Sequence, residues 1–156
     1  APNERTTEIY TSLPDLLSKS GELTKKAGIQ FAYHNHDFEF AKYEDTLAYD
    51  HLLKNTSADL VQFEVDLYWI NKAGHDPVAY FEKYPGRFPL WHVKDMEANT
   101  KDITQVGSGT IDFDKIFAAK KLAGMEYWFV EQDVSKMDIF ESLKMSRDYV
   151  NKKGYL

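Results

Sequence analysis

Four short apolar runs of this sequence each end at residues able to bind a metal ion, and stretches of helical character separate the runs. Strands that alternate with helices form a parallel sheet. In such a sheet, side chains at the carboxyl ends of the strands converge on one face, where active sites are usually built. The pattern therefore predicts a parallel α/β fold with one site. The runs are 29–33 before His34, Asn35 and His36; 60–65 before Asp66; 88–91 before His92; and 127–130 before Glu131.

The expected order of elements is one helix followed by four strand–helix units. Strands are expected over residues 30–36, 60–65, 89–93 and 127–131. Helices are expected over 14–26, 46–54, from Asp76-Pro77 to the residue before Pro85, from Asp112 to Gly124, and over 138–152. Ser12, Asp76 and Asp112 are the expected N-caps. The expected core-facing residues of these helices are Leu47, Leu52, Leu53, Ile116, Phe117, Leu122, Ile139, Phe140, Leu143 and Val150.

Four parallel strands covered by helices correspond to half of an eight-fold TIM barrel. A whole barrel needs roughly 250 residues, whereas this chain has 156. Two architectures remain open: a smaller open sheet, or a single half-barrel (β/α)4 domain over residues 1–156. In the second case the open sheet edges need a partner. We therefore expect either a homo-oligomer or a requirement for the missing half-barrel.

Composition narrows the class of protein. A hydrophobic content of 43% and an aromatic content of 15% indicate a folded globular chain. The net charge of −6 disfavours a nucleic-acid partner bound by neutralising phosphates. No apolar run approaches the length of about 18 residues that a membrane helix needs, so no membrane association is expected. There are no cysteines, which excludes disulfides, thiolate catalysis and Cys-based zinc sites.

Alternation along the strands places several polar side chains on one face. His34 and His36 are expected to point the same way, with Asn35 opposite. This pair suits a metal ligand beside an acid–base group, although hydrogen-bonded residues at a strand end are the alternative. On the next strand, Asp66 lies at the exit and is expected to be a ligand. Glu64 lies deeper and is expected to be structural, with a buried partner.

The last two strands carry two more candidates for the site. His92 and Lys94 are expected to share a face, where the lysine stabilises developing charge; a structural salt bridge with Asp95 or another acid is the alternative. Glu131 follows four apolar residues and needs a metal or a lysine as partner. Trp69 forms either an apolar wall against a sugar ring or part of the core. Residues 107–109 read as a flexible loop at the rim of the site, because no phosphate-loop motif is present.

Two imidazoles on different strands and two carboxylates suit one divalent ion. The predicted ligands are His34, Asp66, His92 and Glu131. Mixed nitrogen and oxygen donors are compatible with manganese, cobalt, magnesium or zinc, and the absence of sulfur favours manganese.

Four stretches of the chain resemble the sugar phosphate isomerase/epimerase family of the xylose isomerase-like barrel superfamily. They are residues 33–40 (YHNHDFEF), 92–95 (HVKD), 107–113 (GSGTIDF) and 130–131 (VE). The resemblance covers nearly the whole chain and implies the C-terminal half of the barrel, strands five to eight. Family members hold a divalent ion with Glu, Asp, His and Glu from these strands. Asp66, His92 and Glu131 match the last three, while His34 stands in place of the first Glu and Trp69 in place of a common His.

The resemblance implies metal-assisted proton abstraction next to a carbonyl of a small carbohydrate. His36 or Glu131 moves the proton in this scheme, and Lys94 stabilises the developing charge. The outcome is isomerisation, epimerisation or elimination; the inosose dehydratases also carry a histidine-rich fifth strand. A metal-dependent phosphodiesterase is disfavoured, because the chain has only five histidines and is acidic. A catalytically inactive fragment or a binding domain is the remaining alternative.

Overall fold

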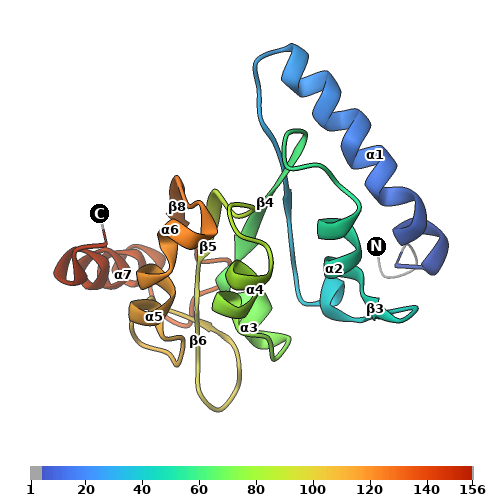
Figure 1. Cartoon of the computed structure of the whole chain (residues 1–156). Helices are drawn as coiled ribbons and strands as arrows, with labels where there is room; N and C mark the ends of the chain where they lie inside the picture. The colour runs from blue at the N-terminus through green and yellow to red at the C-terminus, as the bar shows by residue number, and fades with distance from the viewer. Residues whose placement is uncertain (1–4, 156) are drawn as a thin grey trace.

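The computed structural model describes residues 5–155 (Figure 1). Its centre is a parallel sheet whose spatial order β1-β4-β5-β8 follows the order of the chain. The prediction of parallel β/α units is confirmed. The four strands are β1 (Phe31–His34), β4 (Val61–Asp66), β5 (Leu90–Val93) and β8 (Tyr127–Val130).

Helices and short hairpins connect these strands, and Figure 1 shows α1 and α7 at opposite ends of the molecule. Within the described residues, no helix is both long and apolar enough to cross a membrane. The helices are α1 (Thr7–Lys26), the 3₁₀ turn η2 (Phe38–Phe40), α2 (Ala48–Lys54), α3 (Leu67–Lys72), α4 (Pro77–Lys83), α5 (Phe113–Ala118), α6 (Lys120–Ala123) and α7 (Ile139–Lys153). Two antiparallel pairs complete the structure: β2 (Lys42–Tyr43) with β3 (Thr46–Leu47), and β6 (Asp95–Met96) with β7 (Ile103–Thr104).

The register of the sheet brings the predicted site residues level with one another. His34 of β1 lies opposite Glu64 of β4, and two residues further along β4, Asp66 lies opposite His92 of β5. Glu131 directly follows β8, and its N–H donates to the Val93 carbonyl at 3.2 Å, which extends the ladder by one residue. Four segments distant in sequence therefore end at one edge of the sheet.

The core lies between the sheet and the helices that cover it. Along β4 the side chains of Val61, Phe63 and Val65 are buried, whereas the intervening Gln62 and Glu64 are only partly buried. Strand alternation thus separates an apolar face under the helices from a polar face that carries the site. On the covered face, the rings of Phe81 and Trp91 stack with centroids 5.1 Å apart. Trp91 also donates its indole N–H to the Phe88 carbonyl at 3.0 Å.

The predicted caps of the middle helices are confirmed, but the predicted start of the first helix is wrong. Asp76 accepts the N–H of Val78 at the start of α4, and Asp112 accepts that of Lys115 in α5. Helix α1 begins at Thr7 and is capped by Thr6, not by Ser12. The hydroxyl of Ser12 instead donates to carbonyls inside the helix. The first turns of α1 present mostly polar side chains, so the apolar period does not reveal them.

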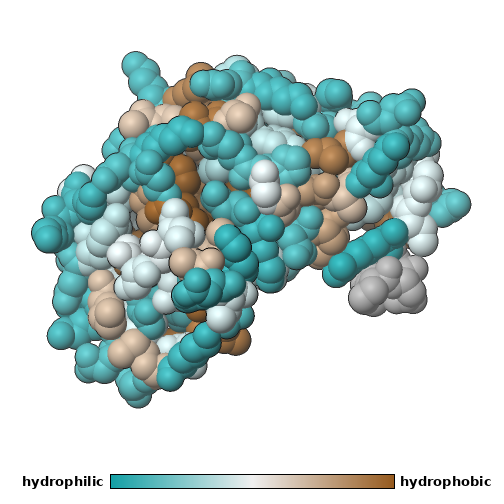
Figure 2. All heavy atoms as spheres, turned by 90° about the horizontal axis from the view of Figure 1, so that it is seen from below, coloured by the Kyte–Doolittle hydropathy of each residue, from teal (hydrophilic) through white to brown (hydrophobic). Residues whose placement is uncertain are grey.

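The predicted core face of the last helix is mostly wrong. Val150 is buried as expected, together with two serines, but Phe140 is 78% exposed and Ile139 and Leu143 also reach solvent. Leu122 is likewise 41% exposed, although Ile116 and Phe117 are buried as predicted. Helical periodicity identifies which face is apolar, not whether another element covers it. Figure 2 shows hydrophobic side chains reaching the surface between hydrophilic ones.

Candidate metal centre

Asp66 has one carboxylate oxygen bound to the backbone and the other directed at the site. Its Oδ1 accepts the N–H groups of Tyr68 and Trp69, each at 2.9 Å, and so caps α3. Its own N–H donates to the side-chain oxygen of Asn35 at 3.1 Å. The second oxygen, Oδ2, lies 3.9 Å from His34 Nε2 and 3.8 Å from His92 Nδ1. Asp66 is fully buried, so its Oδ2 is a carboxylate oxygen that faces the site without contact with water.

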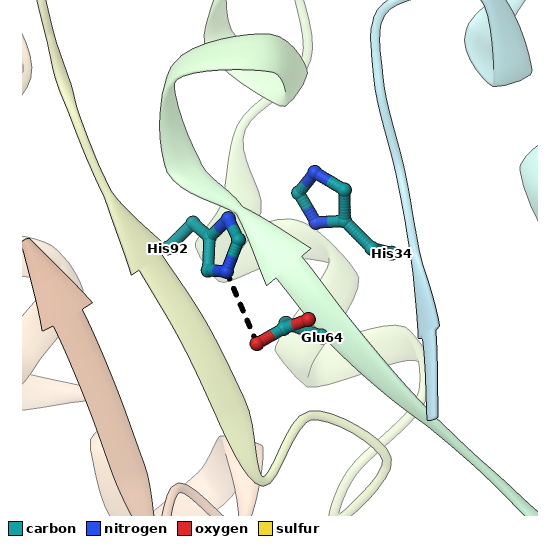
Figure 3. Close-up of side chains that lie close together, drawn as sticks. All are labelled: His34, Glu64 and His92. Atoms are coloured by element: carbon teal, nitrogen blue, oxygen red, sulfur yellow. Dashed lines mark ion pairs between the residues drawn. The ribbon is translucent and has the colours of Figure 1, made fainter. Parts of the chain in front are cut away.

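His92 lies at the centre of the cluster. Its Nδ1 lies 2.6 Å from Glu131 Oε2, and its Nε2 lies 3.1 Å from Glu64 Oε1. One set of potential ligand atoms, from Asp66, His92 and Glu131, lies within 4.8 Å of one another. A second set, from His34, Glu64 and His92, meets the same limit (Figure 3). The structure thus places the other three predicted ligands around His92, with His34 at the edge of the first set.

Lys94 is buried beneath these carboxylates. Its Nζ lies 2.9 Å from Asp66 Oδ2, 2.7 Å from Glu131 Oε2 and 3.0 Å from Asp133 Oδ2. Burial alone would lower the pKa of Lys94, but the negative charge of Asp66 and the close contacts of the ammonium with all three carboxylates raise it above its ordinary value. The ammonium is therefore charged at neutral pH. Its partners are these three acids rather than Asp95, the neighbour considered in the sequence.

The two histidines at the end of β1 lie side by side at the rim, as alternation predicted. The rings of His34 and His36 have centroids 5.1 Å apart. Burial, with the nearby His92 and His36, lowers the pKa of His34 to about 4, so its imidazole is neutral at neutral pH. The ring of His36 stacks on Phe38, and its centroid lies 5.4 Å from that of the half-buried Trp69. Trp69 therefore borders the site beside His36.

Three polar residues at the site are not among the predicted ligands or acid–base groups. Asp133 lies two residues beyond Glu131 and accepts a hydrogen bond from Lys94. The i, i+2 spacing of the two acids is the sequence signal that could have identified Asp133. Glu39 is buried and accepts the Tyr33 hydroxyl at 2.7 Å and the His36 N–H at 2.8 Å. Burial raises the pKa of Glu39. Asn35, expected only to point away from the histidines, ties β1 to the end of β4.

The loop at residues 107–109 is anchored, which corrects its interpretation as a flexible rim. The buried carboxylate of Asp95 accepts the N–H groups of Gly107 and Gly109, each at 2.9 Å, and that of Ile111 at 3.1 Å. A Cβ atom at Gly109 would clash with Asp95 Oδ1 and the Met96 carbonyl. Glycine is therefore needed there for close approach, and the loop is a fixed support of β6.

The donor set fits a divalent cation. Among the described residues, the buried atoms Asp66 Oδ2, His92 Nδ1 and Glu131 Oε2 have no hydrogen-bond partner of good geometry, although the Lys94 ammonium lies close to both oxygens. Unpaired buried acceptors are costly unless a cation or a donor satisfies them. Imidazole nitrogen with carboxylate oxygen is a donor set used by zinc and manganese alike.

The parallel β/α sheet agrees with what the sequence comparisons show. The chain belongs to the xylose isomerase-like TIM barrel family, whose model matches residues 2–148. It is 28% identical to an inosose dehydratase of Clostridium beijerinckii, over 94% of this chain and 55% of that protein. It is 27% identical to an inosose dehydratase of Geobacillus thermodenitrificans, over 93% of this chain and 55% of that protein.

Solved structures show the same relationship. A crystal structure of a sugar phosphate isomerase/epimerase from Parabacteroides distasonis matches with a TM-score of 0.86 and 32% identity, over 96% of this chain and 54% of that one. The chain therefore spans about half the length of the curated relatives it matches. The shared part contains all four strand ends described above.

Proposed function

We propose that this chain carries the metal-binding half of an isomerase or epimerase that abstracts a proton next to the carbonyl of a small carbohydrate. The observation that carries the proposal is the convergence of Asp66, His92 and Glu131, with His34 beside them, at the ends of four parallel strands. We assign these four residues as ligands of one divalent ion. Manganese is favoured, and cobalt, magnesium and zinc are the alternatives.

A bound ion in this position supplies Lewis acidity toward a substrate carbonyl and an adjacent hydroxyl. The chain supplies the remaining groups. Glu131, 39% exposed, and His36, at the rim, are the two candidates for moving the proton. Lys94 holds a fixed positive charge beside Asp66 and Glu131, where it stabilises negative charge developing on the substrate.

Substrate contact is assigned to the rim. Trp69 is half-buried next to His36, and Lys72 lies over its ring with Nζ 4.6 Å from the centroid. An indole face bordered by polar groups suits the apolar side of a sugar ring. We therefore propose Trp69 as a substrate-binding residue. Its ring has His36 and Lys72 as neighbours.

Elimination of a group next to the carbonyl is the second candidate reaction. Its support is the similarity to inosose dehydratases over 94% of this chain. Both candidate reactions begin with the same proton abstraction and differ in what leaves afterwards. A catalytically inactive half or a binding domain is the third candidate, because the matched relatives are nearly twice as long.

Proton abstraction is tested by deuterium exchange. The purified chain, loaded with Mn²⁺, is incubated with a panel of ketoses and keto-inositols in D₂O, and quenched, metal-free samples are read by NMR. Deuterium at the carbon next to the carbonyl, lost in the His36→Gln or Glu131→Gln variant, supports the proposal. A rearranged sugar indicates isomerisation or epimerisation, and loss of water indicates elimination. Metal binding without exchange supports the inactive alternative; no metal binding contradicts the proposed function.

A further inference from the structure

The two ring nitrogens of His92 face different carboxylates. Nδ1 faces the buried oxygens Asp66 Oδ2 and Glu131 Oε2. Nε2 lies 3.1 Å from Glu64 Oε1 (Figure 3). A neutral imidazole carries one N–H and one lone pair, and the hydrogen bond made by one nitrogen fixes which nitrogen binds a metal. The partner of Nε2 therefore determines which nitrogen of His92 is free to bind a metal.

Negative charge is concentrated on the Nδ1 side of the ring. Asp66 Oδ2 and Glu131 Oε2 are buried there, and the Lys94 ammonium lies within 3 Å of both oxygens. This is the place where the fold already stabilises a positive charge. Glu64, by contrast, contributes a single carboxylate on the Nε2 side, and its side chain is 22% exposed. The two sides are thus suited to a cation and to an N–H donor, respectively.

We propose that Glu64 is a positioning residue that accepts the Nε2–H of His92 and holds the Nδ1 lone pair toward Asp66 and Glu131. This inference rests on the proposed function, because it takes His92 as a metal ligand. It revises the structural role expected for Glu64. The reason lies in β4: Glu64 and Asp66 are two residues apart and share a face, so both reach His92 on the neighbouring strand.

The alternative is that Glu64 is itself a ligand, in the set His34, Glu64 and His92. In that case Nε2 binds the ion and Nδ1–H donates to Glu131. The two arrangements predict opposite tautomers of His92. They also differ in the expected effect of replacing the Glu64 carboxylate by an amide. An amide oxygen accepts a hydrogen bond nearly as well, so a positioning role predicts little change. An amide is a poor ligand in place of a carboxylate, so a ligand role predicts loss of metal binding.

The test compares Glu64→Gln and Glu64→Leu in the intact chain by calorimetric titration with Zn²⁺ and Mn²⁺. We expect Glu64→Leu to weaken metal binding by about 10- to 100-fold, as is typical for loss of a group that orients a histidine ligand. Glu64→Gln is expected to stay within a few-fold of wild type. The control is Gln62→Leu, two residues earlier on the same face of β4, which should leave the affinity unchanged. Circular dichroism checks that each variant is folded.

A second readout is independent of affinity. Long-range ¹H–¹⁵N correlation spectra of the Zn²⁺-loaded, ¹⁵N-labelled chain should show His92 protonated at Nε2 and bound through Nδ1. Loss of binding in Glu64→Gln as severe as in Asp66→Asn, or protonation at Nδ1, overturns the positioning role and makes Glu64 a ligand. Unchanged affinity in Glu64→Leu also overturns it. Failure of the wild type to bind either metal overturns the proposed function as well, whereas the first three outcomes leave that function standing.

Discussion

Lys94 Nζ lies 2.9 Å from Asp66 Oδ2, so a buried cation directly after β5 contacts the carboxylate that ends β4. The same ammonium also contacts Glu131 and Asp133. This one side chain neutralises much of the negative charge that the site concentrates. It thereby offsets the repulsion among these carboxylates in the metal-free protein.

Replacing Lys94 with Met is expected to destabilise the metal-free protein. The variant leaves the buried Asp66 carboxylate without its cation, and breaking a buried ion pair on one side costs about 3 kcal/mol. Urea denaturation in the presence of a chelator measures the free energy of unfolding. Adding a divalent ion should increase the free energy of unfolding of Lys94→Met by more than it increases that of wild type. Equal stability of both proteins in chelator would show that the carboxylates do not depend on Lys94.

Two substitutions at Asp66 should distinguish the roles of its two carboxylate oxygens. Asp66→Asn keeps one oxygen to accept the N–H groups of Tyr68 and Trp69, but loses the charge that faces the site. We expect metal affinity to fall by at least ~100-fold, beyond the effect of a residue that only orients a ligand. Asp66→Ala should show the same loss and also lower the free energy of unfolding by about 1 kcal/mol more, because α3 loses its cap. Calorimetry and urea denaturation measure the two effects.

Glu39 is expected to make stability depend on pH. Burial raises its pKa above the ordinary 4.5, so the folded protein keeps this proton to a higher pH than the unfolded chain. When the folded state binds more protons, stability falls as pH rises. Wild type should therefore lose stability relative to Glu39→Gln as the pH rises above 4.5, the ordinary pKa of the carboxyl group. Denaturation at several pH values measures the difference, and a constant difference would contradict the prediction.

Gly109→Ala tests the anchored loop. The added methyl group would clash with the Asp95 carboxylate and the Met96 carbonyl, both buried and fixed by β6. We expect a loss of about 2 kcal/mol in the free energy of unfolding, in the range for overpacking a tight site. The matched control is Ser108→Ala, at the exposed neighbouring position, which should change stability by less than ~0.5 kcal/mol. Similar stability of the two variants would mean that the loop accommodates the added methyl group by a small shift, and would contradict the prediction.

Self-association is expected from the open edges of the sheet. Among the described residues, no strand pairs with the outer side of β1 or of β8, and Tyr127 of β8 is 63% exposed. Unpaired strand edges recruit other strands, and a lysine on the edge opposes this. We propose a second copy of this chain as the partner. Sedimentation velocity should show a dimer that Tyr127→Lys shifts toward monomer. A single species at 18.1 kDa for wild type would contradict this.

The site could be predicted from sequence mainly because strand ends obey simple geometric rules. Asp66 and His92 were assigned to one cluster from two facts: each follows an apolar run, and parallel strands end on the same side. Alternation then predicts that Lys94 shares a face with His92. The Asp76-Pro77 pair identified a helix start for an equally local reason. None of these inferences needed knowledge of distant contacts.

Other features depend on contacts that no local pattern encodes. Glu64 is expected to be structural because it lies deeper in its strand than Asp66. Its contact with His92 on the neighbouring strand has no signal in the local pattern. The anchoring of residues 107–109 depends on Asp95, more than ten residues away. The exposure of Phe140 depends on what covers α7, whereas periodicity reports only which face is apolar.

The double use of the Asp66 carboxyl group limits how this site can be altered. Because one oxygen caps α3 and the other faces His92, exchanging this residue for a histidine or a soft ligand would also remove the N-cap of that helix. His34 and Glu131 cap no helix within residues 5–155. Engineering or natural drift toward another ion should therefore proceed through those two positions, while the aspartate at the end of β4 stays fixed.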